Sequence, residues 1–186
     1  MAAGALAFGQ SGTLALGASQ IGNGLSSGLG NALYLAGIAW NLPNTAIGLA
    51  LGTIGYVLGN IDYFIGQSET RPTISFGNNA IQFMNNPFMF WGVITLGNAI
   101  NYNSQIGPNR IDPDNSPWTF GDHERPHTYQ GMLLGPFYLP AYLGGMIAVL
   151  FQGSFNVFGY QHFMEHGPYY PRLYNLPPRP WGRPRP

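Results

Sequence analysis

The chain has 186 residues, of which only 8% are charged, and its seven arginines and seven acidic residues cancel at neutral pH. This composition offers no basic surface that would gather nucleic acid, so we expect no nucleic-acid partner. Cysteine is absent, which excludes disulfides, thiolate catalysis and cysteine-ligated zinc and leaves histidine and carboxylate as the ligands for any metal ion.

Residues 1–42 are rich in glycine, alanine, serine and leucine, and no charged side chain occurs before Asp62. Two interpretations stay open for this segment: apolar helices that pack through small residues such as Gly24 and Gly28, or a flexible linker. Its first residues lack the positive charge and the continuous apolar core of a signal peptide. If the protein is secreted or delivered into another cell, we expect a different export device.

A helix is expected to follow Pro43. Residues 46–61 are an apolar run, and Asn44 or Thr45 precedes this run in the position of a helix N-cap. The length of the run lies on the border between a buried core helix and a membrane span, which needs about 20 residues. The sequence is compatible with both.

Residues 71–103 change to the two-residue period of β-strands. The stretches TISF, AIQFM, FWGVITL and AINYN alternate apolar with polar residues and are separated by the turn signals GNN, NNP and GN. We therefore predict a small antiparallel meander of three or four strands. Residues 104–120 contain three prolines and are predicted to be a loop.

The sequence HERPH at residues 123–127 is the strongest chemical signal in the chain. On a helix, His123 and His127 project from one face, where both imidazoles can bind one Zn²⁺. Glu124 is then the expected general base, which takes a proton from a water molecule activated by the zinc. Gln130 lies on the same helix face and is either a substrate-binding residue or a surface amide.

Pro126 inside this motif limits where the helix can begin. Proline in a helix interior loses a hydrogen bond and clashes with the preceding turn. We therefore predict that the helix begins at the motif itself, with Asp122 or His123 as its N-cap and Pro126 in its first turn.

A second apolar run follows at residues 132–151, where Pro136 and Pro140 are expected to break or kink a helix. This segment is predicted to be helical and either buried or membrane-associated. Residues 171–186 form a tail rich in proline and arginine, which we expect to be extended.

A catalytic zinc site needs a third protein ligand. The other two histidines of the chain and Glu165 gather in QHFMEH, residues 161–166. Glu165 is preferred because two histidines and one glutamate are an established catalytic set, and His162 or His166 is the alternative third ligand. A purely structural role for these histidines among aromatic neighbours is the competing interpretation.

The predicted fold class is α+β. It consists of glycine-rich apolar N-terminal helices, a small antiparallel meander, the helix of the HERPH motif and a further apolar helical segment. The expected organisation is an apolar segment or linker at residues 1–42, a metallopeptidase-like domain at residues 43–170 and the tail at residues 171–186.

The block HERPHTYQGMLLGPFYLP, with supporting stretches NLPNTAIGL, ISFGNNAIQFMNNPF, GVITLGNAI, HFMEHGPY and PPRPW, resembles the C-terminal regions of large bacterial polymorphic toxins of the Rhs and haemagglutinin-repeat kind. The resemblance covers residues 40–181. It implies a zinc metallopeptidase-like domain with a zincin-like minimal core that is delivered into another cell and countered there by an immunity protein. The functional residues that it implies are His123, Glu124, His127, Gln130 and Glu165.

Two classes of function therefore compete. The first is a zinc-dependent hydrolase, with a metallopeptidase as the leading case, in which an edge strand holds an extended peptide or protein substrate. The second is a membrane-inserting or structural effector module, in which residues 1–61 and 132–151 enter a bilayer and the HERPH helix is not catalytic. A membrane-associated metallopeptidase would combine the two.

Overall fold

The computed structural model describes residues 28–90, 92–112, 118–156 and 162–165. Its elements in chain order are α2 (Gly28–Trp40), α3 (Leu42–Phe64), β1 (Thr73–Gly77), β2 (Ala80–Met84), β3 (Val93–Leu96), β4 (Ala99–Tyr102), α4 (Phe120–Leu134), the 3₁₀ helix η2 (Gly135–Phe137) and α5 (Tyr138–Phe151). The fold is α+β, as predicted from the sequence.

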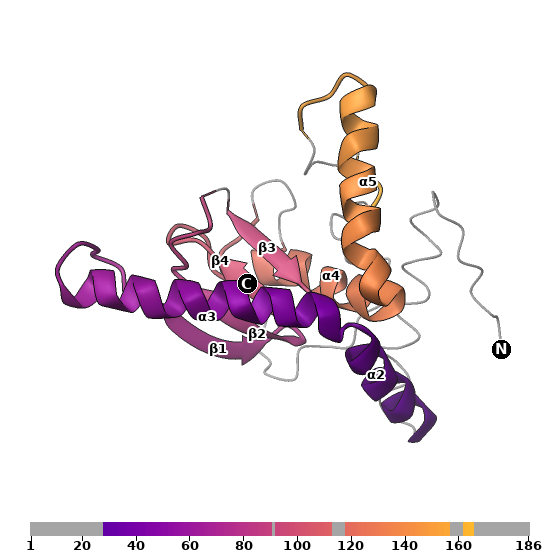
Figure 1. The fold of residues 1–186 in the computed structure, drawn as a ribbon, viewed down its shortest axis with the longest axis horizontal. Coiled ribbons are helices and arrows are strands. Elements are labelled where there is room, and N and C mark those ends of the chain that lie inside the picture. Colours follow the sequence, from indigo (N-terminus) through magenta and orange to yellow (C-terminus); the bar gives the residue numbers. More distant parts are fainter. Residues whose placement is uncertain (1–27, 91, 113–117, 157–161, 166–186) are drawn as a thin grey trace.

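The sheet lies between two helices, α3 on one face and α4 on the other (Figure 1). All four residues of β4 are buried. On one face, Asn101 Nδ2 donates to the carbonyl oxygen of Gly48 in α3 at 3.3 Å. On the other face, the hydroxyl of Thr95 in β3 donates to Glu124 in α4 at 2.7 Å. The sheet therefore fixes the position of α4, which carries the HERPH motif.

The order of the strands differs from the predicted antiparallel meander. The sheet has the order β1-β2-β4-β3, in which two antiparallel hairpins are joined by parallel pairing of β2 with β4. The prediction was wrong because residues 85–92 are too long for a tight turn. Asn86 holds this connection at the end of β4, donating from its backbone N–H to Tyr102 O and from Nδ2 to Asn101 Oδ1, both at 2.9 Å. As a result, β3 is an edge strand.

The turn between β1 and β2 also holds α4. Asn78 and Asn79 both have positive φ, 50° and 63°, as a two-residue hairpin turn matched to the strand twist requires. The side chain of Asn79 donates to Thr128 Oγ1 of α4 at 2.8 Å. One asparagine thus both forms the turn and connects the first hairpin to the helix of the motif.

Residues 28–40 are helical, which favours the packed-helix interpretation over a linker for this part of the chain. Gly37 of α2 lies against Met132 of α4, where an added Cβ would be 3.0 Å from the methionine methyl group. Of the two small residues named for this packing, Gly28 begins α2, and Gly24 lies outside the described residues.

α3 begins earlier than predicted, with Asn41 as N-cap in place of Asn44 or Thr45. Both of these side chains lie inside the helix and bind other groups. Asn44 Nδ2 donates to Gly135 O at 2.7 Å, and Thr45 Oγ1 donates to Asn41 O at 3.1 Å. Asn44 therefore connects the start of α3 to the junction after α4.

α3 packs on the sheet through glycines. An added Cβ would lie 2.5 Å from Leu96 O at Gly48, 2.2 Å from the Phe83 ring at Gly52, and 2.2 Å from Asn86 Oδ1 at Gly55. No larger side chain fits in this contact without displacing the sheet, because cores are packed without spare volume. The large apolar side chains of α3 point in other directions.

We expect Gly52→Ala to lower the free energy of unfolding by about 1–3 kcal/mol, since the Phe83 ring would have to move. This loss would outweigh the helix-propensity gain of alanine over glycine, which is at most about 1 kcal/mol. Urea unfolding followed by circular dichroism measures the change. The control is Gly144→Ala in α5, where nothing lies within 4 Å of the added Cβ. Equal losses in both variants would contradict the close contact.

The helices α4 and α5 are separated where Pro136 was predicted to interrupt the apolar run. Gly135 takes a positive φ of 55°, and η2 redirects the chain. α5 then rises away from the sheet (Figure 1).

Both α3 and the stretch Phe120–Phe151 are long and apolar enough to cross a membrane, by length and composition alone. The predicted tail, residues 171–186, lies outside the described residues.

Candidate metal centre

α4 begins with a capping box, not with the motif itself. Thr119 is the N-cap, its hydroxyl accepts from the Asp122 N–H at 3.2 Å, and Asp122 Oδ2 accepts from the Thr119 N–H at 3.1 Å. The predicted N-cap, Asp122 or His123, is therefore wrong. Pro126 lies inside the helix, beyond the first turn. Even so, α4 continues through the motif and keeps the four-residue spacing of the two histidines.

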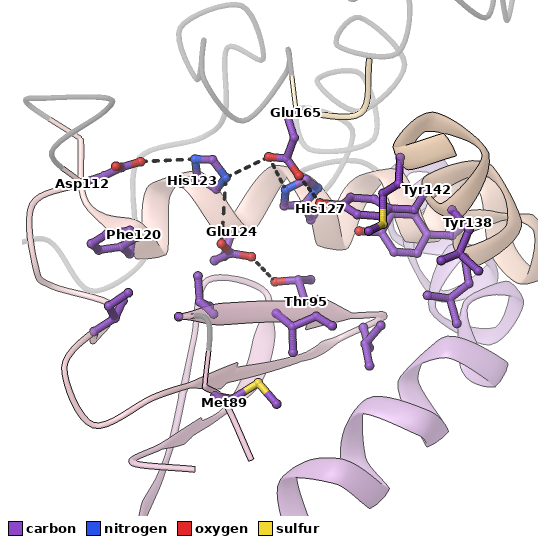
Figure 2. A pocket seen from close by; sticks show the side chains of 18 residues that line it. Met89, Thr95, Asp112, Phe120, His123, Glu124, His127, Tyr138, Tyr142 and Glu165 are labelled. Atoms are coloured by element: carbon purple, nitrogen blue, oxygen red, sulfur yellow. Dashed lines mark hydrogen bonds and ion pairs between the residues drawn. The ribbon is translucent and has the colours of Figure 1, made fainter. Parts of the chain in front are cut away.

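His123, His127 and Glu165 converge on one point, as predicted (Figure 2). Glu165 Oε2 lies 3.2 Å from His123 Nε2 and 3.4 Å from His127 Nε2. One potential ligand atom from each residue lies within 4.8 Å of the other two. Two imidazole nitrogens and one carboxylate oxygen could therefore hold a metal ion.

Gln130 orients His127. Gln130 Oε1 lies 2.8 Å from His127 Nδ1, and Gln130 Nε2 donates to Met164 O at 2.9 Å. Because the amide oxygen can only accept, His127 Nδ1 donates, and Nε2 is left facing Glu165. Gln130 is almost fully buried, so it is not a surface amide. It does not line the pocket, so the structure gives no support to the predicted role in substrate binding either.

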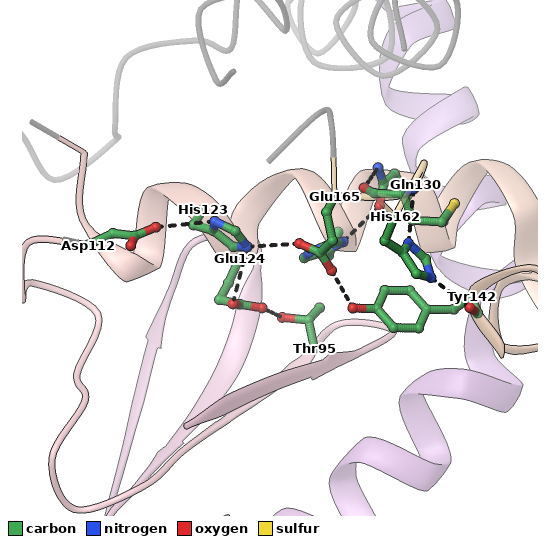
Figure 3. A network of polar contacts seen from close by, with 10 residues as sticks. Thr95, Asp112, His123, Glu124, Gln130, Tyr142, His162 and Glu165 are labelled. Carbon is green, nitrogen blue, oxygen red and sulfur yellow. Dashed lines mark hydrogen bonds and ion pairs between the residues drawn. The ribbon is translucent and has the colours of Figure 1, made fainter. Parts of the chain in front are cut away.

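Asp112 supports His123 in the same way, and the sequence analysis missed it (Figure 3). Asp112 Oδ2 lies 3.3 Å from His123 Nδ1. The loop is joined to the start of α4 by backbone hydrogen bonds that include Asp112 N to Trp118 O and Phe120 N to Arg110 O. A carboxylate behind a metal-binding histidine is a common arrangement, and the few acidic residues of the chain were the signal that could have pointed to it.

We expect Asp112→Asn to lower the affinity for a divalent metal ion about 10–100-fold while the fold is kept, because the charge that holds His123 is lost. Competition with a chromophoric chelator measures the affinity. Asp62→Asn, at the far end of α3, is the matched control and should have no effect. Unchanged affinity in Asp112→Asn would show that the carboxylate does not support the centre.

Tyr142 holds the other oxygen of Glu165. Its hydroxyl donates to Glu165 Oε1, while Glu165 Oε2 faces the two histidines. Tyr142 comes from α5, and its ring lies edge-on to that of His127. The sequence analysis did not identify this residue because its position depends on the break between α4 and α5.

The alternative third ligand His162 is not supported. Both of its ring nitrogens bind backbone groups: Nε2 lies 2.8 Å from Tyr142 O, and Nδ1 accepts from the Met164 N–H at 3.1 Å. This fully buried imidazole holds α5 to the turn that carries Glu165. The other alternative, His166, lies outside the described residues.

Glu124 is near the centre but is held by a different element. Glu124 Oε2 accepts from the Thr95 hydroxyl at 2.7 Å, and Oε1 lies 4.0 Å from His123 Nε2. Both Glu124 and Thr95 line the pocket. One carboxylate oxygen is thus fixed by the sheet, and the other faces the group of potential ligands.

The pocket at this centre has a volume of about 480 Å³. One wall is β3, and another is α4 and α5 (Figure 2). Its lining is mainly apolar and includes Ile94, Leu139, Leu143 and Met146. A concave apolar site with a few converging polar groups is the usual form of a binding site for small molecules or side chains.

The charges of the centre are strongly coupled. Burial by itself lowers the pKa of His123, but the hydrogen bonds to Asp112 and Glu165 and the charges of Glu124 and Glu165 together outweigh burial and raise this pKa to about 10. Burial also lowers the pKa of His127, but the charge of Glu165, the hydrogen bond to it and the charge of Glu124 together outweigh burial and raise this pKa. The two imidazoles in turn overcome the burial of Glu165 and hold its pKa well below the ordinary value. A metal ion would have to displace protons from these histidines.

The described residues thus define an α+β protein with a group of two histidines and one glutamate, of which His127 and Glu165 are buried, that could bind a metal ion. Comparisons with protein-family models, curated proteins and solved structures found no match to this chain.

Proposed function

We propose that the chain is a zinc-dependent hydrolase, with metallopeptidase as its leading activity. The observation that carries this proposal is the convergence of His123 Nε2, His127 Nε2 and Glu165 Oε2 at the pocket. Two nitrogens and one carboxylate oxygen match a ligand set of catalytic zinc, which leaves one position open for water or substrate. The oxygen acceptors of Gln130 and Asp112, which lie behind the two histidines, support the same assignment.

When bound, zinc would act as a Lewis acid and lower the pKa of water. Glu124 is the general base of this proposal. Its Oε2 is anchored by Thr95, so Oε1 can accept a proton from water in the pocket and pass it to the leaving amine. Because the carboxylate is anchored by the sheet, the proton acceptor needs little reorganisation during the reaction.

A peptide or protein is the proposed substrate class. β3 is one of the two edge strands of the sheet, and its residues from Val93 to Leu96 all line the pocket. An extended peptide can pair with such an edge and place alternate side chains in a neighbouring pocket. The apolar lining from α5 would favour an apolar side chain next to the cleaved bond.

Delivery into another cell, and inhibition there by an immunity protein, are proposed on the resemblance to polymorphic toxins. Expression in the cytoplasm of a bacterial host tests toxicity. Growth inhibition by the wild-type chain, but not by Glu124→Gln, is the expected result. Equal inhibition by both would favour a membrane-inserting effector, the second candidate function, because α3 and the stretch Phe120–Phe151 have the length and composition of membrane spans. That candidate also predicts vesicle leakage that survives Glu124→Gln.

Removal of the metal ion tests the proposed hydrolase. We expect about one zinc per chain in protein purified without chelator, as measured by elemental analysis. Treatment with a chelator should abolish hydrolysis of an unfolded protein substrate, and one equivalent of zinc should restore it. Protein that contains no metal and still hydrolyses the substrate would overturn the assignment.

A further inference from the structure

The side chains of α3 are arranged in the opposite way to those of a helix in a soluble domain. Its buried residues are small or polar, namely Asn44, Thr45, Gly48, Gly52, Gly55 and Gly59. Its large apolar side chains point away from the sheet, and Ile47, Ile54 and Ile61 are each about half exposed. Soluble helices turn their apolar stripe toward the core. Helices in lipid make protein contacts through small residues and leave large apolar residues outside.

The outward face of α3 is defined by its exposed residues between positions 42 and 61: Leu42, Pro43, Ala46, Ile47, Ala50, Thr53, Ile54, Val57, Leu58 and Ile61. No charged residue belongs to this face, and Thr53 is its one polar side chain. The face extends over about 30 Å at 1.5 Å per residue. Exposed Trp40 and Tyr63 flank its two ends, and such aromatic residues favour the boundary between lipid and water.

The sheet extends the same apolar surface. Phe83 faces α3, since its ring lies against Gly52. Ile74 is paired with Phe83 across the sheet, and Phe76 follows two residues later, so both lie on the face that α3 covers. Ile74 and Phe76 are nevertheless exposed, because β1 is an edge strand and α3 does not cover them.

A lipid bilayer fits this surface better than a protein partner. Protein interfaces usually form about one hydrogen bond per 100–200 Å² and include charged or polar residues at their rim. The outward face of α3 offers the Thr53 hydroxyl alone for such bonds. Lipid tails require no hydrogen bonds, so the absence of polar groups has no cost there.

The packing of α3 determines its orientation in the bilayer. Contacts run from Gly48 at Leu96 of β3 to Gly59 at Pro72, the residue before β1, and so extend over about half of the helix. If α3 crossed the hydrocarbon, it would carry the exposed edge of β1 into lipid, where unpaired backbone groups are not tolerated. The helix must therefore lie parallel to the membrane surface.

We propose that the outward face of α3 docks the protein on a lipid bilayer, with the helix in the plane of the interface. Its apolar side chains would enter roughly 5–10 Å, as in other interfacial helices. The metal centre lies beyond the opposite face of the sheet, where Thr95 contacts Glu124, so docking leaves the centre uncovered. This inference does not depend on the proposed hydrolase activity.

Flotation of the full chain with phosphatidylcholine vesicles tests the docking surface. The chain should float with these neutral vesicles equally well in 0.15 M and 1 M salt, because the docking surface carries no charge. The double variant Ile54→Glu/Leu58→Glu should lower the partition coefficient by about tenfold or more. The matched control, Phe151→Glu/Phe155→Glu at the last residue of α5 and just beyond it, introduces the same charges at exposed apolar residues and should keep binding.

Two further measurements keep the variant result interpretable. Circular dichroism should show the same helix content in Ile54→Glu/Leu58→Glu as in wild type, and its metal affinity should be unchanged. Size-exclusion chromatography without lipid should give a monomer. A wild-type dimer that this variant dissociates, with no binding to vesicles, would overturn the proposal and assign the face to a second copy of the chain.

Labels at single positions test the orientation, because the chain has no cysteine of its own. Ile47→Cys and Ile61→Cys, each carrying an environment-sensitive fluorophore, are separated by about 21 Å along the helix. Both labels should be quenched equally by lipids that carry a quencher at shallow depth. Labels found at opposite surfaces of the bilayer would overturn the in-plane orientation. If Ile54→Glu/Leu58→Glu floats with vesicles as well as wild type does, the outward face of α3 is not the docking surface.

Discussion

Replacing Glu124 with glutamine is expected to lower hydrolysis of an unfolded protein substrate about 10²–10⁴-fold, while the metal content stays at the wild-type level. Glutamine keeps the size of the side chain and can still accept from Thr95, but it cannot take a proton from water. Elemental analysis and a single-substrate rate measurement on the same preparation separate the two effects.

Glu69→Gln is the matched control for this variant, because it makes the same change at an exposed position in the loop after α3. It should leave rate and metal content unchanged. Loss of metal in Glu124→Gln would show that Glu124 belongs to the ligand set. A normal rate with normal metal content would exclude Glu124 as the general base and would leave the metallopeptidase proposal without a proton acceptor.

Replacing Glu165 with glutamine is expected to lower metal affinity more than a hundredfold, which exceeds the loss usual for groups behind the ligands. The reason is that the carboxylate of Glu165 lies between His123 and His127, with Oε2 within 3.4 Å of both Nε2 atoms. Zinc titration against a competing chelator measures the loss. Hydrolysis should fall in proportion to metal occupancy and recover in part at high zinc concentration.

The outcome of Glu165→Gln also decides between the candidate third ligands. His162 is held by two backbone groups, so His162→Gln should lower stability and leave metal affinity within a fewfold of wild type once the chain is folded. If Glu165→Gln binds metal as tightly as wild type, the third ligand is another residue, and the remaining candidate from the sequence is His166.

Much of the site could be predicted because it is local in sequence. The two histidines of HERPH are four residues apart, and any helix through them places both on one face. Pro126 did not prevent this, although its predicted place in the first turn was wrong, since Thr119 and Asp122 cap the helix earlier. Glu165 was found from ligand chemistry and the clustering of histidines, without knowledge of the fold.

The residues behind the ligands depended on tertiary contacts and were missed or given the wrong role. Asp112 reaches His123 because its loop pairs with residues 118–120, and Tyr142 reaches Glu165 because the chain turns at Gly135. Gln130 was identified on the correct helix face. Its role depends on the turn at Met164, whose carbonyl oxygen accepts a hydrogen bond from the Gln130 amide nitrogen.

The sequence by itself determined the local elements: three or four strands with the turns at GNN and GN, the helix of the HERPH motif, and the apolar character of residues 42–61. These follow from the spacing of apolar residues and from turn and cap residues within a few positions. Only the tertiary structure decided the parallel pairing of β2 with β4, the supports of the two histidines and the direction in which α3 turns its apolar side chains. Each of these depends on contacts between residues that are distant in the sequence. One example is the close contact of the glycines of α3 with Phe83 and Asn86.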